Sequence, residues 1–234
     1  MRISAPVLAA SAAVVLGWSS VAAAVPASAA PPKCADLNGS VDASQMCQIQ
    51  EADPAYTLHI AYPVDYPDVQ PVFDYIKQTR DGFINVAKMP DWRSMPYQLD
   101  TKATEYNSAV PPRGTQSVVF ETYQDVGGAH PQTFYKSFNW DQGYRTPITI
   151  DNLFREGTQP FPVIFPIVQT ELQKQVGESV AISPSVGLDP SKYENFAITN
   201  DTLIFFFSQG ELLGEAAGAR QVTVPRGPID AMIA

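Results

Sequence analysis

Histidine supplies the imidazole base of many active sites, and this chain of 234 residues contains only two, His59 and His130. His130 belongs to the run Gly127, Gly128, Ala129, His130 and Pro131, where small side chains let a ligand approach the backbone closely. His130 could therefore bind a ligand or transfer a proton. Alternatively, its ring could hold the loop in place through a hydrogen bond to a neighbouring carbonyl or carboxylate. We favour the second role and keep Gly127–Pro131 as a candidate binding loop.

Other catalytic signals are weak. The sequence contains no G-x-S-x-G elbow, no H-E-x-x-H motif, no phosphate loop and no dinucleotide fingerprint. Its 24 acidic side chains could include a glycosidase pair, but nothing marks two of them as partners. Asp141 precedes Gln142-Gly143 and is predicted to cap a turn. A zinc site would need both histidines and both cysteines. We therefore predict no catalytic residue, no metal site and no cofactor.

The first 29 residues are predicted to be a cleaved secretory signal peptide. Arg2 is their only charged residue, an apolar run extends from Ala5 to Leu16, and Ala27-Ser28-Ala29 fits the A-x-A cleavage rule. A second possible cut follows Ala24, and a membrane anchor is the alternative interpretation. Because prolines and small residues make this segment weakly apolar, we favour cleavage and a secreted, extracellular domain of residues 30–234.

Cys34 and Cys47 are the two cysteines of the chain. In an exported protein, two cysteines predict a disulfide, and a loop of this length is stabilised by roughly 3 kcal/mol in the chain-entropy model. Two free catalytic thiols are the alternative, which we disfavour because the cysteines do not form a C-x-x-C pair. The polar residues between them are expected to have little regular structure.

The overall composition indicates a folded, acidic protein. The apolar share of 45% is enough for a core, and 24 acidic against 15 basic side chains give a formal charge of −9. This balance argues against nucleic acid as a partner and against binding to anionic membranes. No linker rich in Pro, Gly or Ser divides the chain, so we expect one domain after the signal peptide and a monomer.

The residue patterns predict mixed strands and helices. In residues 55–62, alternation places Tyr56, Leu58, Ile60 and Tyr62 on one face of a strand and His59 on the other. Apolar residues at helical spacing predict two main helices at 67–87 and 161–176, the second with Pro166 in its first turn. Further strands flank two hairpin loops, at 115–124 and 132–140 and at 195–199 and 202–207. The strands come in hairpins, which predicts an α+β fold with a largely antiparallel sheet of about seven strands packed with two main helices.

The aromatic-rich stretches, Phe134–Trp140 and Phe205–Phe207, have two interpretations. Their rings could form a platform on which sugars stack. Aromatic side chains at alternating strand positions more often pack inside a core, and we favour that role for both stretches.

Several motifs follow one another in the order found in a known family. They are Val126–Pro131, Phe138–Gly143, Ile148–Phe154, Leu203–Phe207 and Gly210–Leu212. In these motifs the sequence resembles the secreted mycobacterial immunogenic antigens, the family that includes the antigen used to identify the tuberculosis complex. This family shares a domain with the extracellular part of a lysozyme-sensing anti-sigma factor. The likeness extends over essentially the whole chain after the predicted signal peptide.

The resemblance implies an exported, non-catalytic α+β protein that host immunity recognises, and it carries over no catalytic residue. We expect a binding protein at the host–pathogen or cell-wall interface, with a host or cell-envelope protein as partner. Lysozyme is a partner by analogy only, although its basic charge would favour association with an acidic chain. The second hypothesis is a cell-wall or glycan hydrolase that uses His130 or a carboxylate pair.

Overall fold

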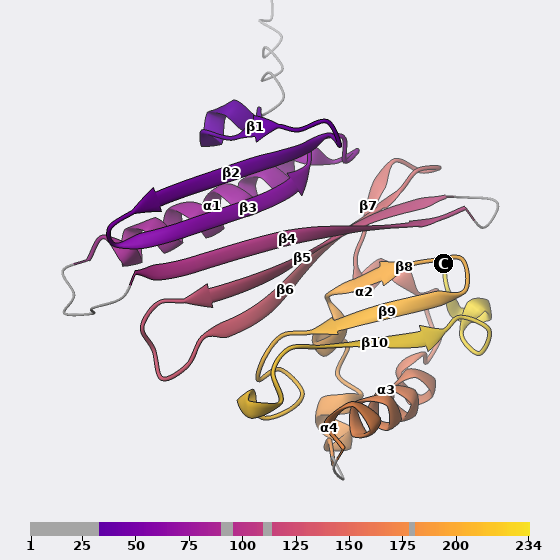
Figure 1. Ribbon diagram of the computed structural model, residues 1–234. Helices are drawn as coiled ribbons and strands as arrows, with labels where there is room; N and C mark the ends of the chain where they lie inside the picture. The colour runs from indigo at the N-terminus through magenta and orange to yellow at the C-terminus, as the bar shows by residue number, and fades with distance from the viewer. Residues whose placement is uncertain (1–32, 90–95, 110–113, 178–180) are drawn as a thin grey trace, which may run out of the picture. The chain divides into compact units, whose positions relative to one another are not determined.

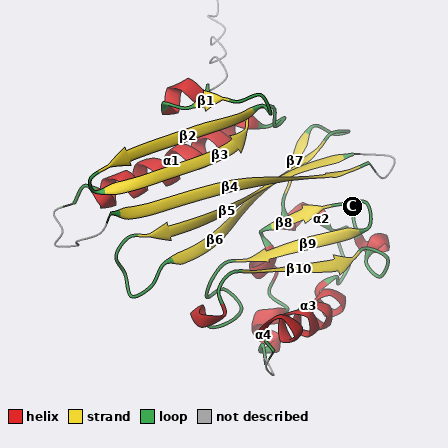
Figure 2. Ribbon diagram, in the orientation of Figure 1, coloured by secondary structure: helices red, strands yellow, loops and turns green. Residues whose placement is uncertain are grey.

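The computed structural model describes residues 33–89, 96–109, 114–177 and 181–234. These residues form two β-sheets, two long helices and several short helical turns (Figures 1 and 2). The predicted signal peptide, residues 1–29, lies outside the described residues. Within the described part of the chain, no helix has both the length and the apolar content needed to cross a membrane.

The first sheet has seven strands that lie side by side in chain order. Neighbouring strands are antiparallel except for β3 and β4, which are parallel because a helix, α1, connects them. The strands are β1 (Ser40–Val41), β2 (Met46–Asp53), β3 (Tyr56–Pro63), β4 (Tyr97–Ser108), β5 (Thr115–Asp125), β6 (Gln132–Asp141) and β7 (Thr146–Ile148). The predicted α+β class with a largely antiparallel sheet and two main helices is confirmed.

Helix α1 (Val69–Ala87) lies behind the first sheet in the view of Figure 1. Its buried residues lie on one side of the helix, as helical spacing predicts. They are Val72, Phe73, Ile76, Phe83 and Ala87. They pack against the buried face of β3, which carries the aromatic and apolar side chains predicted for it. The helix and the strand therefore form where the sequence pattern places them.

The second sheet has three antiparallel strands in the order β10, β9, β8, and the sequence did not predict it as a separate sheet. Its strands are β8 (Phe196–Ile198), β9 (Thr202–Phe207) and β10 (Arg220–Pro225). Helix α3 (Phe161–Val176) packs against it through Ile164, Val168 and Leu172. The shorter helices are α2 (Ile150–Leu153) and α4 (Pro184–Gly187), with 3-10 turns at Cys34–Leu37, Pro190–Tyr193, Glu215–Ala217 and Asp230–Met232.

One expectation about α3 is wrong. Pro162 occupies the first turn, and Pro166 lies inside the helix. Proline has no N–H, so Pro166 cannot donate a hydrogen bond to the carbonyl one turn earlier. Burial of the apolar side of α3 offsets that loss. The helix ends at Gly177, whose φ of 70° is the left-handed conformation expected for a glycine just past a helix.

The second sheet packs on the face of the first sheet that is opposite α1. Val119 on β5 contacts Ala197 and Phe206 there, whereas its neighbour Phe120 belongs to the core beneath α1. Successive side chains of a strand point to opposite faces, so the two cores lie on opposite sides of the seven-stranded sheet.

Side chains of the first sheet bind the outer edge of β8. The backbone N–H of Phe196 donates to Ser137 Oγ at 3.0 Å, and the backbone N–H of Ile198 donates to Ser117 Oγ at 3.3 Å. The Asn139 amide donates to the Phe196 carbonyl at 2.9 Å. These groups are buried, so each contact satisfies a backbone group that would otherwise lack a partner.

Candidate functional site

The glycine-rich loop connects β5 and β6, and Gly127–Pro131 are all exposed. Gly127 has a φ of 80°, which glycine adopts readily. His130 Nε2 lies 2.8 Å from Glu215 Oε2, and Nδ1 lies 3.1 Å from the Pro131 carbonyl oxygen. These are the carboxylate and carbonyl contacts that the structural interpretation of His130 requires. Both partners are acceptors, so this arrangement favours a ring that is protonated on both nitrogens.

The same contacts perturb the titration of His130. The Pro131 carbonyl raises the pKa of His130 most, and the Glu215 carboxylate raises it further by hydrogen bonding and by charge. A raised pKa means that the folded loop favours the protonated ring. The link between the loop and Glu215 is therefore strongest while the His130 ring is protonated, and it weakens as the pH rises through the raised pKa of His130.

We expect Glu215→Gln to lower the pKa of His130, because the variant removes the negative charge beside Nε2. The pKa should remain above that of an ordinary histidine, because the Pro131 carbonyl is still present. A pH titration of the histidine ring signals by NMR measures both values. An unchanged His130 titration in the variant would contradict this account.

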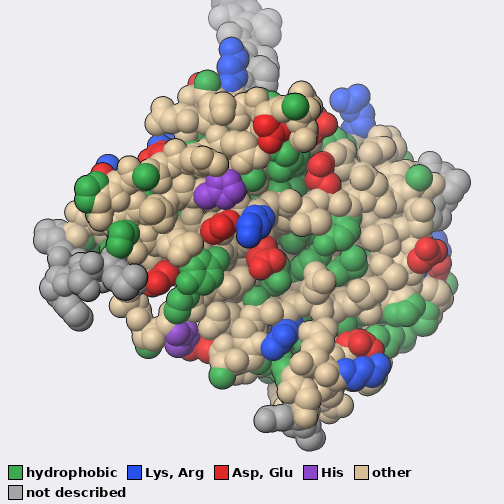
Figure 3. All heavy atoms as spheres, viewed as in Figure 1, with side chains coloured by type: hydrophobic (Ala, Val, Ile, Leu, Met, Phe, Trp, Pro, Cys, Tyr) green, Lys and Arg blue, Asp and Glu red, His purple; other side chains and the backbone are tan. Residues whose placement is uncertain are grey.

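His59 lies on the exposed face of β3, as predicted. Its Nδ1 is 3.7 Å from Asp100 Oδ1, and its Nε2 is 3.3 Å from Gln48 Oε1. The face of the molecule shown in Figure 3 carries acidic, basic and histidine side chains close together. A shallow hollow of about 390 Å³ next to Asp100 is lined by Gln98, Lys102, Glu121 and Tyr123.

Neither histidine has the neighbours of a serine hydrolase. In the parts of the chain that the structure describes, the ring nitrogens contact carboxylate, amide and carbonyl groups, and none contacts a serine or threonine hydroxyl. A serine nucleophile needs such a base within hydrogen-bonding distance. The same residues also contain no group of three or more His, Cys, Asp or Glu side chains that could hold a metal ion.

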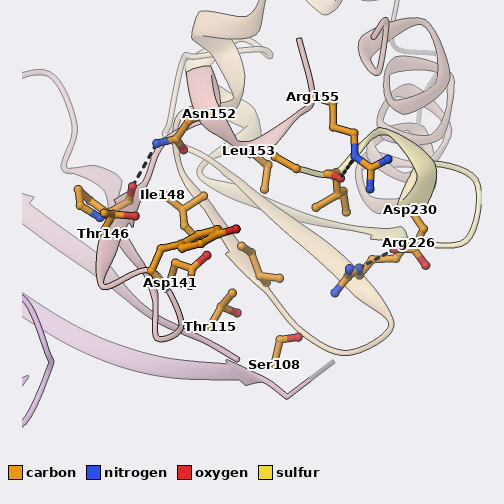
Figure 4. Close-up of a pocket in the computed structure, with 15 residues that line it drawn as sticks. Ser108, Thr115, Asp141, Thr146, Ile148, Asn152, Leu153, Arg155, Arg226 and Asp230 are labelled. Carbon is orange, nitrogen blue, oxygen red and sulfur yellow. Dashed lines mark hydrogen bonds and ion pairs between the residues drawn. The ribbon is translucent and has the colours of Figure 1, made fainter. Parts of the chain in front are cut away.

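A cavity of about 520 Å³ lies where β7, α2 and the C-terminal residues meet the ends of β4, β5 and β6 (Figure 4). One side of it is apolar, with Leu153 and Ile198 buried and Ile148 and Ile233 half-buried. The other side carries Ser108, Thr115, Asp141 and Thr146 from the first sheet. The cavity therefore has one hydrocarbon wall and one polar wall.

The polar wall contains a hydroxyl without a partner. Thr115 Oγ1 is buried and makes no hydrogen bond to any described residue. Asp141 Oδ1 accepts the backbone N–H groups of Gly143 and Tyr144, each at 2.8 Å, so the predicted turn-capping role of Asp141 is confirmed. This turn holds the short strand β7 against the end of β6.

Arg226 is a cationic side chain of the cavity that several contacts fix in place. Its side chain is only 12% exposed, Nε donates to Asp230 at 2.9 Å, and Nη1 donates to the Thr199 carbonyl at 3.1 Å. Its Nη2 has no hydrogen-bond partner among the described residues. In Figure 4 the guanidinium group points into the cavity. The fixed guanidinium can therefore offer its remaining N–H donors to a ligand.

The C-terminus completes the wall. The backbone N–H of Ala234 donates to the Leu153 carbonyl at 3.0 Å, and the Arg155 N–H donates to the Met232 carbonyl at 2.7 Å. Arg155 Nε also donates to the Ile233 carbonyl at 2.9 Å. These bonds fix the last residues of the chain beside α2.

The structure separates most of the residues singled out by sequence from this cavity. Gly127–Pro131 and the cysteine pair do not line it, whereas Asp141 does, together with Ile148, Asn152 and Leu153 from one of the family motifs. Sequence reasoning missed Ser108, Thr115 and Arg226. A signal for Arg226 was available, because a lone cation in Pro225-Arg226-Gly227-Pro228 is held in a rigid turn.

Part of the chain matches the model of a protein family of unknown function. The model of that family, DUF3298, matches residues 151–227, which run from α2 to just past β10 and include Arg226. Immunogenic proteins MPT64 of Mycobacterium tuberculosis and MPB64 of Mycobacterium bovis are each 54% identical over 209 residues, or 89% of this chain and 91% of the relative. The chain belongs to the MPT64/MPB64 family of immunogenic proteins. The family resemblance seen in the sequence is confirmed.

The chain is also similar to a further sequence relative and to two solved structures. The esterase Rv3036c of Mycobacterium tuberculosis is 51% identical over 216 residues, 92% of each chain. Among solved structures, a DUF3298 protein of Pseudomonas aeruginosa has a TM-score of 0.54 at 10% identity and covers 81% of this chain and 93% of its own. A DUF3298 protein of Bacteroides fragilis has a TM-score of 0.52 at 16% identity and covers 81% of this chain and 92% of its own. The structural matches indicate a shared fold.

Proposed function

We propose that this member of the MPT64/MPB64 family is an exported binding protein without catalytic activity, and that the cavity beside Arg226 holds its ligand. The observation that carries the proposal is a largely covered guanidinium, 12% exposed, that points into a cavity of about 520 Å³ with one nitrogen that has no partner among the described residues. This volume lies within the range of small-molecule sites, about 300–1,000 Å³. The predicted signal peptide and the Cys34–Cys47 disulfide support export, because disulfides persist in oxidising compartments.

The two walls define the chemistry of the ligand. Leu153 and Ile198 favour an apolar body, while Arg226 favours a head group that accepts hydrogen bonds. A short amphiphile with a carboxylate, phosphate or ester head has both features.

Octanoate, which has a carboxylate head and an apolar chain, is a suitable probe. We expect Arg226→Met to weaken octanoate binding by about 10- to 100-fold. The reason is that a hydrogen bond to a charged group contributes about 1.5–3 kcal/mol. Isothermal titration calorimetry on the purified protein measures the affinity. Lys174→Met is the matched control, because it removes an exposed cation of α3 that does not line the cavity. Octylamine should bind more weakly than octanoate. No binding of octanoate, or equal affinity in both variants, would contradict the proposal.

Esterase activity is a second candidate, favoured by the 51% identity to the relative named an esterase. An acyl ester is also a short amphiphile, so the same cavity would accept it. Hydrolysis of p-nitrophenyl esters with acyl chains of increasing length distinguishes the two functions. Binding alone predicts no turnover above that of the heat-denatured protein. Saturable turnover that falls in a folded Arg226→Met variant would replace the binding proposal with hydrolysis.

For a macromolecular partner, we propose the exposed loop Gly127–Pro131 as the contact element. Its exposure and its attachment through His130 to Glu215 support this role, because a held loop loses less entropy on binding. Capture of a host or cell-envelope protein should fall when Gly127–Pro131 is replaced by serines. Unchanged capture would remove the loop from the proposal.

A further inference from the structure

A second groove, here named the α1 groove, lies between α1 and the β5–β6 hairpin. It has a volume of about 480 Å³, and the residues that matter for the argument are Gln78, Thr79, Gly82, Phe83, Gln124 and Phe134. The Tyr75 ring, which also borders it, packs against Phe120 at 5.5 Å on the α1 side of the first sheet. The α1 groove is therefore on the opposite face of that sheet from the cavity beside Arg226.

The groove is neutral in a strongly acidic chain. None of the side chains that line it carries a charge, although the chain has a formal charge of −9. A charged group that entered would lose hydration without gaining a counter-charge. The occupant that fits the groove is therefore an uncharged molecule.

Gly82 makes the groove deeper at a cost to the helix. Glycine inside a helix is unfavourable relative to alanine, because the unfolded chain has more conformational freedom. A Cβ atom at Gly82 would meet no other atom within 4 Å, so packing inside the protein does not require glycine. The missing side chain instead leaves the α1 backbone open at the groove. A ligand can approach that backbone closely.

Two polar side chains of the groove, Gln78 and Gln124, are available to a ligand. The side-chain amides of Gln78 and Gln124 make no hydrogen bond to the described residues, and each offers a donor and an acceptor. Phe134 places its aromatic ring in the same groove and is half-buried rather than part of the core, whereas Phe83 is 2% exposed and belongs to the core beneath the groove. A purely apolar occupant would cover both amides without pairing them, which is unfavourable.

We propose that the α1 groove binds a neutral saccharide. Such a sugar presents an apolar C–H face to the ring of Phe134. Its hydroxyl groups pair with Gln78 and Gln124. This is one form of the sugar-stacking role considered for the aromatic stretch that begins at Phe134, and it is independent of the ligand held beside Arg226.

An NMR titration of the full chain with chitotetraose tests the proposal. We expect shifts at the backbone amides of Thr79, Gly82 and Gln124. Gly82→Leu places a side chain in the groove and should weaken binding by at least about tenfold. Phe134→Ala should weaken it about threefold to tenfold through the lost ring. A hyaluronan tetrasaccharide, which has acetamido groups but also carboxylates, should bind more weakly than chitotetraose.

Gly82→Ala tests whether binding can weaken in a variant whose fold is not destabilised. It should raise Tm by about 2–4 °C, because alanine favours the helix, and should still weaken chitotetraose binding. Gln70→Leu, an exposed position of α1 outside the groove, is the matched control and should bind like the original chain. Any one of three results overturns the proposal. They are no shift at the groove up to about 5 mM sugar, equal affinity for the charged sugar, or unchanged affinity in folded Gly82→Leu and Phe134→Ala variants.

Discussion

Phe205→Ala is expected to lower the free energy of unfolding by about 3–5 kcal/mol. Phe205 is 0% exposed, and its ring contacts those of Tyr193 at 5.1 Å and Phe196 at 6.4 Å. Removing it deletes buried apolar surface and leaves a cavity that the neighbouring rings cannot fill without moving. Urea unfolding followed by circular dichroism measures the change.

Met89→Ala is the control for Phe205→Ala, since Met89 is 60% exposed. It should change stability by less than about 0.5 kcal/mol. Phe205 lies on the central strand β9, between β8 and β10, so its loss should also weaken octanoate binding by loosening the wall that carries Ile198. A loss of stability below about 1 kcal/mol would show that the second sheet repacks around the gap.

The double variant Cys34→Ser, Cys47→Ser is expected to lose about 3 kcal/mol of stability. The bond joins residues 13 apart and attaches the first helical turn to β2, and Cys47 is fully buried. Serine would add an unpaired hydroxyl at that position, which increases the loss. Gly39 belongs to the same arrangement, because a Cβ there would come within 2.7 Å of Cys34 Sγ and 2.8 Å of Cys47 Sγ.

Reductant provides the control for the disulfide variant. The original chain should lose a similar amount of stability in dithiothreitol, whereas the double variant should be insensitive to it. Denaturant unfolding with and without reductant measures both. If the original chain unfolds at the same denaturant concentration in both conditions, the disulfide does not contribute as expected.

Local patterns were sufficient to predict the elements that have one buried face. The helical spacing from Val72 to Ala87 gave α1, and the alternation from Tyr56 to Tyr62 gave β3. The glycine pair before His130 gave the hairpin between β5 and β6. Each of these signals depends on residues that are close in the chain, so tertiary contacts are not needed to read them.

The elements that were missed depend on distant partners or on weak signals. Strand β2 alternates buried Cys47 and Ile49 with polar Gln48 and Gln50, but four positions are a short pattern beside a polar segment. The carboxylate that binds His130 belongs to Glu215, 85 residues away. The cavity was not predictable, because Ser108 and Arg226 meet there only after two separate sheets have packed together.

The way in which β8 ends the second sheet limits how this protein can associate. An unpaired strand edge is where one chain can recruit a strand of another, as in amyloid and domain swapping. At β8 that edge is already occupied by Ser117, Ser137 and Asn139, and beyond β10 the Gln175 amide donates to the Gln221 carbonyl at 2.8 Å. Copies that meet at high concentration therefore cannot join by extending the outer edge of β8.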